Sequence, residues 1–103
     1  MRFHVYALKQ PKSSATPYVL DLQSDLLDGL KSRVVAPLRL LSCMRKAELI
    51  QDLMPTFSIN GKKYVLVTQE MASFPLAQMG KVVADLTPQN PTILNALDRL
   101  LSS

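Results

Sequence analysis

The chain has 103 residues, 48% of them hydrophobic and 19% charged, a composition typical of a globular domain and not of a disordered segment. We therefore expect one domain over residues 1–103. No stretch reaches the roughly 18 consecutive apolar residues of a membrane span, and no export signal is visible near the N-terminus. One cysteine and one histidine exclude an internal disulfide and a usual zinc site. The sequence predicts a cytoplasmic protein with no metal and no other cofactor.

The net charge indicates the kind of partner. Twelve Lys and Arg against eight Asp and Glu give a formal net charge of +4, which favours an acidic partner, either nucleic acid or an acidic protein segment. A nucleic-acid-binding face usually shows as a basic stripe interleaved with aromatic residues. Here Arg45-Lys46 and Lys62-Lys63 are isolated pairs, so we expect a solvated surface and no direct nucleic-acid binding.

Residues 2–8 alternate between two faces, and two further short runs contain β-branched and aromatic residues, so three strands are predicted in the N-terminal part of the chain. The third strand should end at Pro37, because proline has no backbone N–H to donate to a neighbouring strand. The segment that follows, residues 38–54, carries charges on most faces and is expected to be a loop with one helical turn. The predicted strands are residues 2–8, 17–22 and 33–36.

The clearest local signal is a β-hairpin around Asn60-Gly61. Residues 56–59 and 62–69 are rich in β-formers, and Asn-Gly between such runs favours a type I′ turn, because both turn residues adopt positive φ at low cost. Residues 71–75 should turn the chain, and residues 76–86 should form one or two short strands.

One helix is predicted at the C-terminal end, beginning at Thr87-Pro88. Threonine can cap the first free N–H groups, and proline at the first helical position loses no hydrogen bond. The apolar stripe of this helix consists of Ile93, Leu94, Leu97, Leu100 and Leu101. It is broad enough to pack on the sheet along one edge and still leave apolar surface for a partner. Leu26-Leu27, in a polar turn region, is similarly hard to bury. We give equal weight to the simpler interpretation, in which these leucines complete the core.

No residues form a convincing catalytic set. His4 is the only imidazole and is interpreted as a polar-face strand residue. Basic neighbours could lower the pKa of Cys43, but a buried or incidental thiol is the simpler interpretation. Asp21, Asp25 and Asp28 lie close together, yet a calcium loop needs a denser oxygen pattern and a closing glutamate. Carboxylates around a turn more often cap backbone groups.

Two blocks of sequence are distinctive. They are Gln23-Ser24-Asp25-Leu26-Leu27-Asp28 and Met71-Ala72-Ser73-Phe74-Pro75. Weaker blocks lie at residues 3–6, 19–22, 33–38, 68–70, 83–86 and 95–97. In this order the blocks resemble the CcdB toxin family over nearly the whole chain, with one slip in length between Pro37 and Pro55.

The resemblance implies a mainly β fold, an SH3-like barrel of short antiparallel strands with one C-terminal helix, related to the MazF toxins and working as a homodimer. CcdB toxins are not enzymes. They bind the A subunit of DNA gyrase and trap the cleaved complex. A CcdA-like antitoxin neutralises them through an acidic, disordered segment that folds on the toxin, which suits a net positive charge. The resemblance thus implies a gyrase-poisoning toxin of a type II toxin–antitoxin system of bacteria, of the kind that serves plasmid maintenance.

The family's contact residues carry over to specific positions of this sequence. By resemblance, the dimer interface includes Gln69 and Met71. The gyrase contacts, also by resemblance, are Leu26, Leu27, Asp98, Leu101, Ser102 and Ser103. Well-known members end in Trp-Gly-Ile, whereas this sequence has two serines there and an aspartate where the family usually has an amide. An aromatic anchor carries much of the energy of an interface, so the resemblance also implies weaker gyrase poisoning.

Two alternatives stay open. The first is a family member that keeps antitoxin binding but has lost gyrase poisoning. The second is an mRNA endonuclease on the related MazF-like barrel, in which His4, Arg33 or Arg39 would have to supply the base and the cation near the scissile phosphate.

Overall fold

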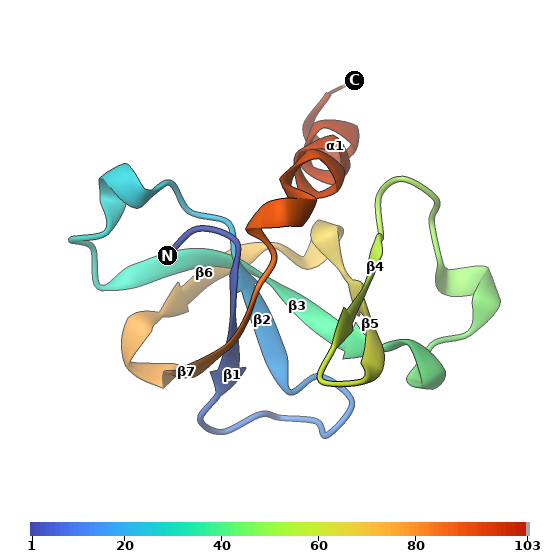
Figure 1. Cartoon of the computed structure of the whole chain (residues 1–103), viewed down its shortest axis with the longest axis horizontal. Helices are drawn as coiled ribbons and strands as arrows, with labels where there is room; N and C mark the ends of the chain where they lie inside the picture. Colours follow the sequence, from blue (N-terminus) through green and yellow to red (C-terminus); the bar gives the residue numbers. More distant parts are fainter. Residues whose placement is uncertain (103) are drawn as a thin grey trace.

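The computed structural model describes residues 1–102, which form seven strands and one α-helix joined by short 3-10 turns (Figure 1). The strands are β1 His4–Leu8, β2 Tyr18–Asp21, β3 Ser32–Leu40, β4 Thr56–Ile59, β5 Lys62–Leu66, β6 Ala72–Pro75 and β7 Met79–Asp85, and the helix is α1 Asn90–Leu101. The 3-10 turns are η1 Asp25–Leu27, η2 Leu41–Cys43, η3 Lys46–Glu48, η4 Thr68–Glu70, η5 Leu76–Gln78 and η6 Thr87–Gln89.

All the strands pair antiparallel in one sheet with the order β4-β5-β3-β2-β1-β7. Strand β6 pairs with β3 alone. The nine residues of β3 therefore pair with β2 on one side and with β6 and then β5 on the other. The sheet curls into a half-barrel, and α1 rises from one side of it with its C-terminal end pointing away (Figure 1). The mainly β fold with one C-terminal helix is thus confirmed.

The main core lies between the inner face of the sheet and the base of α1. Its fully buried members are Val5, Leu20, Ala36, Leu38, Leu66 and Ile93. Full burial of a valine, leucine or isoleucine side chain stabilises a fold by about 1.5–3 kcal/mol relative to exposure. Ile93 and Ala96 hold α1 on the sheet, whereas Leu94 and Leu101 stay exposed. The helix therefore packs along one edge and leaves apolar surface free, as its stripe predicted.

The predicted end of the third strand at Pro37 is wrong, because β3 continues to Leu40. The Pro37 carbonyl accepts a hydrogen bond of 2.9 Å from the Val67 N–H. The N and C=O of one strand residue face the same neighbour, so the nitrogen of Pro37 points away from β2, where Pro37 pairs with Val19. No β2 partner is left without a donor, and the strand tolerates the proline.

Two further segments differ from the prediction. The predicted turn at residues 71–75 contains β6, which pairs with Ser32–Val35 of β3. It is a short strand with three exposed residues and a proline at its end, so it has no alternating pattern, and such strands are common at sheet edges. Residues 38–54 have no α-helical turn; they contain the end of β3 and the 3-10 turns η2 and η3.

The hairpin prediction is confirmed, and the predicted helix cap is wrong. Asn60 and Gly61 have φ of 52° and 81°, the left-handed values that a type I′ turn requires. Neither N-cap residue, Leu86 of η6 nor Gln89 of α1, makes a side-chain capping hydrogen bond, and Thr87 bonds Asp85 instead. The Asp85 carboxylate accepts hydrogen bonds from the Thr87 hydroxyl at 2.5 Å and from the Thr87 N–H at 2.9 Å. These two bonds hold the pKa of Asp85 below its ordinary value. A 3-10 turn follows, and α1 itself begins at Asn90.

Candidate partner-binding surface

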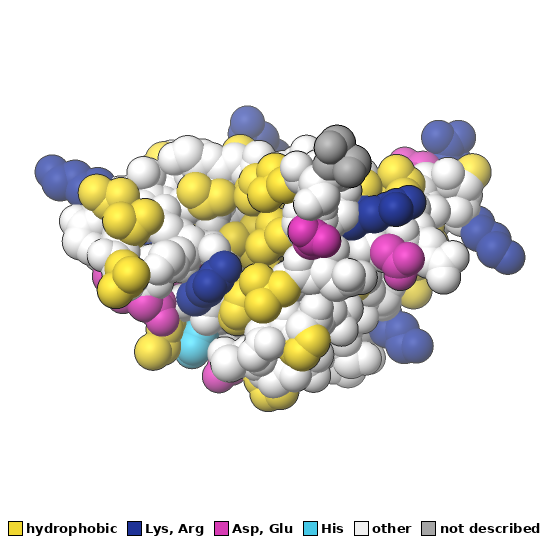
Figure 2. All heavy atoms as spheres, turned by 90° about the horizontal axis from the view of Figure 1, so that it is seen from above, with side chains coloured by type: hydrophobic (Ala, Val, Ile, Leu, Met, Phe, Trp, Pro, Cys, Tyr) yellow, Lys and Arg dark blue, Asp and Glu magenta, His cyan; other side chains and the backbone are white. Residues whose placement is uncertain are grey.

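The loop between β2 and β3 presents three leucines to solvent. Leu26 is 94% exposed, Leu27 50% and Leu30 51%. In Figure 1 this loop and α1 project from the same side of the sheet, and Figure 2, which looks onto that side, shows hydrophobic side chains over the loop and between the loop and the helix. Contiguous exposed apolar surface on a small domain marks a site of protein–protein contact. We refer to Leu26, Leu27 and Leu101 as the leucine face.

Hydrogen bonds hold the exposed leucines in place. The Ser24 hydroxyl accepts from the Leu26 N–H at 3.2 Å, and the Ser24 carbonyl accepts from the Leu27 N–H at 3.0 Å, which together close the turn η1. The side chain of Gln23 donates to the Leu27 carbonyl and accepts from the Val34 N–H of β3. The Gln-Ser-Asp block therefore ties the loop to the sheet and turns Leu26 outward.

A buried network of charges supports the same loop. The Arg33 guanidinium donates to Asp21 at 2.6 Å and to Asp28 at 2.5 Å, and Asp21, which is fully buried, also accepts from the Gln23 N–H. Burial opposes the charge of Arg33, but the hydrogen bonds that it donates to Asp28 and Asp21 outweigh this effect and raise the pKa of the guanidinium. The predicted capping role holds for Asp21, but its pairing with Arg33 was missed. An arginine directly before the apolar run Val34-Val35-Ala36 is the signal that could have indicated it.

On α1, the predicted contact residues lie at the exposed end of the helix. Leu101 is 71% exposed. The Asp98 carboxylate accepts from the Ser102 hydroxyl at 2.9 Å, and the Ser102 N–H donates to the Asp98 carbonyl at 2.8 Å. Asp98 thus orders the end of the helix next to Leu101. Ser103 lies outside the described residues.

The residues predicted at the dimer interface lie elsewhere. Gln69 is an exposed residue of η4 whose amide donates to the sulfur of Met54, and Met71 packs half-buried against the main core. Met71 directly precedes β6, which pairs on one side with β3, and Gln69 lies in the preceding turn η4. Gln69 and Met71 are two residues apart in the sequence, just before this strand, and lie on a different segment from the leucine face.

The three residues named for nuclease chemistry are not brought together. Arg33 is buried and bonded to two carboxylates, and Arg39 donates to the Thr16 hydroxyl. These two arginines lie toward opposite ends of β3, about 20 Å apart at the usual rise per strand residue. His4 on β1 has its Nδ1 3.8 Å from Asp85. Cys43 is exposed in η2, and among residues 1–102 no three metal-ligating side chains are grouped.

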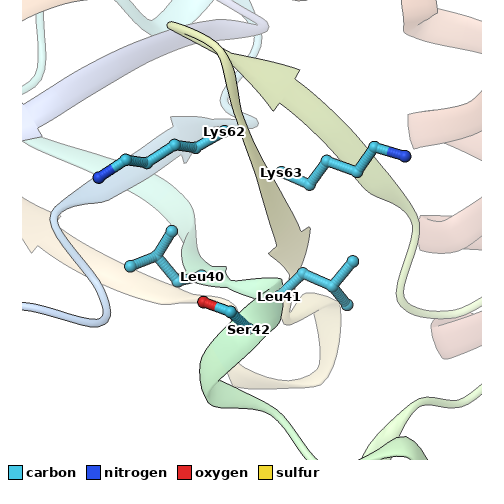
Figure 3. A pocket seen from close by; sticks show the side chains of 5 residues that line it. All are labelled: Leu40, Leu41, Ser42, Lys62 and Lys63. Carbon is cyan, nitrogen blue, oxygen red and sulfur yellow. The ribbon is translucent and has the colours of Figure 1, made fainter.

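A surface hollow of about 440 Å³ lies beside β5. It is lined by Leu40, Leu41, Ser42, Lys62 and Lys63, and Figure 3 shows the two lysines extending to opposite sides of the strand. The ammonium groups diverge, as neighbouring strand residues must, and do not converge on one point. The hollow is apolar at its base with basic side chains at its rim, and it is not an anion cradle.

Solved toxin structures share this fold. The structure is similar to the Mycobacterium tuberculosis toxin MazF-mt6, with a TM-score of 0.71 and 16% identity over 94% of each chain. It is also similar to an endoribonuclease in complex with its cognate antitoxin from a mycobacterial species, with a TM-score of 0.72 and 16% identity over 98% of this chain and 93% of that one. At such identity the likeness shows the fold alone.

The match to a protein family is more specific than the likeness in fold. The model of the CcdB protein family matches residues 2–103, so the chain belongs to the CcdB family, a family of toxins of toxin–antitoxin systems. This confirms the resemblance that the two distinctive sequence blocks indicated. No helix among the described residues is long and apolar enough to span a membrane.

Proposed function

We propose that this protein is a toxin that acts by binding the A subunit of DNA gyrase through the leucine face and trapping the cleaved complex. The observation that carries the proposal is a 94% exposed Leu26 on a loop tied to the sheet by the ion pair between the buried Arg33 and the half-exposed Asp28. An exposed apolar residue on a rigid support loses little conformational freedom when it binds, which favours a docking role. Leu101 at the ordered end of α1 extends the same face.

The proposal includes two protein partners besides gyrase. A CcdA-like antitoxin with an acidic segment suits the formal net charge of +4 and the apolar surface left exposed. A second copy of the chain is proposed to bind through the segment that contains Gln69 and Met71, so that the active form is a homodimer. An isologous contact of this kind lets a small domain share a larger core.

Catalysis is not part of the proposal. RNA cleavage would need a cation free to bind the scissile phosphate and a base near it. Arg33 is committed to Asp21 and Asp28, and Arg39 lies far along the strand. The likeness in fold to an endoribonuclease nevertheless makes RNA cleavage the second candidate, and it is tested alongside gyrase binding. The third is a protein that binds antitoxin without poisoning gyrase.

One set of assays separates the three. The purified protein is incubated with gyrase, ATP and supercoiled DNA, with total RNA, and with the antitoxin encoded by the neighbouring gene. We expect linear DNA after denaturation of the gyrase reaction, intact RNA, and a complex with the antitoxin on a sizing column. Cleaved RNA with unaffected gyrase would establish the endonuclease. An antitoxin complex without gyrase binding or RNA cleavage would establish the third candidate.

A further inference from the structure

Arg2 occupies a fixed position between η1 and the sheet. Phe3, which follows it, has a φ of 65° and a buried ring, so the chain turns sharply before β1 begins at His4. The Arg2 N–H donates to the Asp25 carboxylate in η1 at 2.9 Å, and the guanidinium carbon lies 4.7 Å from the centre of the Phe3 ring. Cation–π stacking of this kind holds an arginine without using its N–H donors.

The donors of Arg2 lack acceptors. Its Nε–H is buried, and no acceptor among the described residues lies within hydrogen-bond distance. No ion pair within residues 1–102 includes its guanidinium. Asp25 bonds the backbone of Arg2, and Asp85 bonds Thr87. A buried donor without an acceptor is unfavourable. The terminal NH2 groups of Arg2 are not among the buried unpaired atoms of the described residues, so they are the donors that an incoming acceptor can reach.

Arg2 lines a surface cleft of about 430 Å³. The cleft is bounded by the N-terminal residues, by Asp25 of η1 and by Asp85 and Thr87 ahead of α1. Leu26, the most exposed leucine of the leucine face, follows Asp25 directly, so a protein that docks on this face also covers the cleft. The cleft is also lined by His4, beside Asp85, and by Met1, whose N-terminal ammonium is paired with Asp21.

We propose that Arg2 binds a carboxylate side chain of the protein that docks on the leucine face; this rests on the proposed function, in which that protein is gyrase A. Arginine presents a planar pair of donors that matches a carboxylate, and it is enriched among the residues that dominate interfaces. Asp25 and Asp85 flank the cleft and repel a polyanion. They therefore favour one carboxylate within an apolar protein surface over nucleic-acid phosphates.

The first test does not depend on gyrase. Hexanoate, a carboxylate on an apolar chain, is titrated into the 15N-labelled protein while the arginine Nε–H signals are followed by NMR, with Arg2→Gln assigning the Arg2 signal. We expect a saturable shift of the Arg2 signal with hexanoate and none with hexanol. An unmoved Arg2 signal overturns the proposal, and so does an equal or larger shift with inorganic phosphate or an RNA oligonucleotide.

The second test measures binding to the dimerisation region of gyrase A by calorimetry. We expect Arg2→Gln to lower the affinity at least ten-fold, Arg2→Lys to recover part of the loss, and the control Lys81→Gln, at an exposed position of β7, to change it less than two-fold. Binding of Arg2→Gln at the wild-type level overturns the role of Arg2. Absence of wild-type binding contradicts the proposed function instead, and the hexanoate titration then decides on Arg2 alone.

Discussion

Arg33 on β3 and Asp21 on β2 face each other with 2.6 Å between the guanidinium and the carboxylate, and their side chains are 5% and 0% exposed. A buried ion pair is weak evidence for stability, because both charges lose their hydration. The pair matters for the structure because Arg33 also binds a second carboxylate. Arg33 also reaches Asp28, so one buried cation joins the sheet to the loop that presents Leu26 and Leu27.

The first prediction concerns this network. Arg33→Gln should lower the free energy of unfolding by up to about 3–5 kcal/mol, the cost of breaking a buried ion pair, because it leaves the buried Asp21 carboxylate with the exposed N-terminal ammonium, 3.1 Å away, in place of a buried guanidinium. Urea unfolding followed by circular dichroism measures the change. Arg45→Gln is the matched control: Arg45 is 85% exposed and pairs only with Glu48, so its loss should change stability by less than about 0.5 kcal/mol. Equal effects of the two substitutions would show that the pair does not stabilise the fold.

The sequence predicted the elements whose signals are local. Alternation located β1 and β2, Asn60-Gly61 located the hairpin, and the stripe of leucines located α1. Strand β6 was missed because an exposed edge strand of four residues is specified by its pairing with β3 and not by a pattern of its own. The continuation of β3 past Pro37 also depends on which neighbour the proline nitrogen faces, and this is a property of the sheet.

The candidate site was predictable only in part. Leu26 and Leu27 could be named from a distinctive block, and their exposure follows from the polar residues around them. The roles of Arg33 and Arg2 could not be predicted from the sequence, because each depends on residues far away along the chain. Arg33 meets Asp21 across paired strands, and Arg2 meets Asp25 in η1. The sequence leaves Arg33 open as a nuclease residue, but its charge is neutralised by Asp21 and Asp28.

The second prediction tests the leucine face. Leu26→Asp should weaken binding to the gyrase A dimerisation region at least ten-fold, about 1.4 kcal/mol, because it removes an exposed anchor and places a charge in the interface. Stability should change by less than about 0.5 kcal/mol, since surface substitutions cost little. The control is Leu76→Asp in η5, an exposed leucine on another segment. If both variants bind like the wild type, the interface lies elsewhere.

The third prediction concerns the homodimer. Sedimentation at micromolar concentration should give twice the chain mass of 11.5 kDa. Gln69→Arg should shift the equilibrium toward the monomer at least ten-fold, because an isologous contact brings the two added charges near each other. Gln89→Arg, at the exposed turn η6, is the control and should leave the dimer intact. A wild-type monomer at these concentrations would contradict the prediction.

The fourth prediction is a loss of stability at alkaline pH. Burial raises the pKa of the Tyr64 hydroxyl above its ordinary value, and burial together with the Asp21 charge does the same for Tyr6. The unfolded chain therefore releases these protons near pH 10, while the folded chain retains them. The folded state binds more protons, so the free energy of unfolding falls as pH rises through and above about 10.

Urea unfolding between pH 8 and pH 11 measures this dependence. Tyr64→Phe removes one of the two hydroxyls and should flatten the decline relative to the wild type, while the lysines contribute equally to both proteins. Parallel curves for the two proteins would show that the Tyr64 hydroxyl does not contribute to the loss.

The last prediction concerns the residues after α1. Replacing Ser102-Ser103 by Trp-Gly-Ile should raise gyrase affinity by roughly thirty-fold to a thousand-fold, equal to about 2–4 kcal/mol, because it adds a large aromatic anchor to the leucine face. The end of α1 is already ordered, because the backbone N–H of Ser102 donates to the Asp98 carbonyl at 2.8 Å. The backbone N–H of a tryptophan at position 102 can make the same bond. Calorimetry with the gyrase A dimerisation region and colony survival on induction compare the two proteins.

Ala-Gly-Ile at the same place is the control: it keeps the length without the aromatic ring and should bind much more weakly than Trp-Gly-Ile. If the unmodified protein already traps gyrase as strongly as the Trp-Gly-Ile variant, the aromatic anchor is not needed in this protein, and the binding energy must come from Leu26, Leu27 and the exposed face of α1.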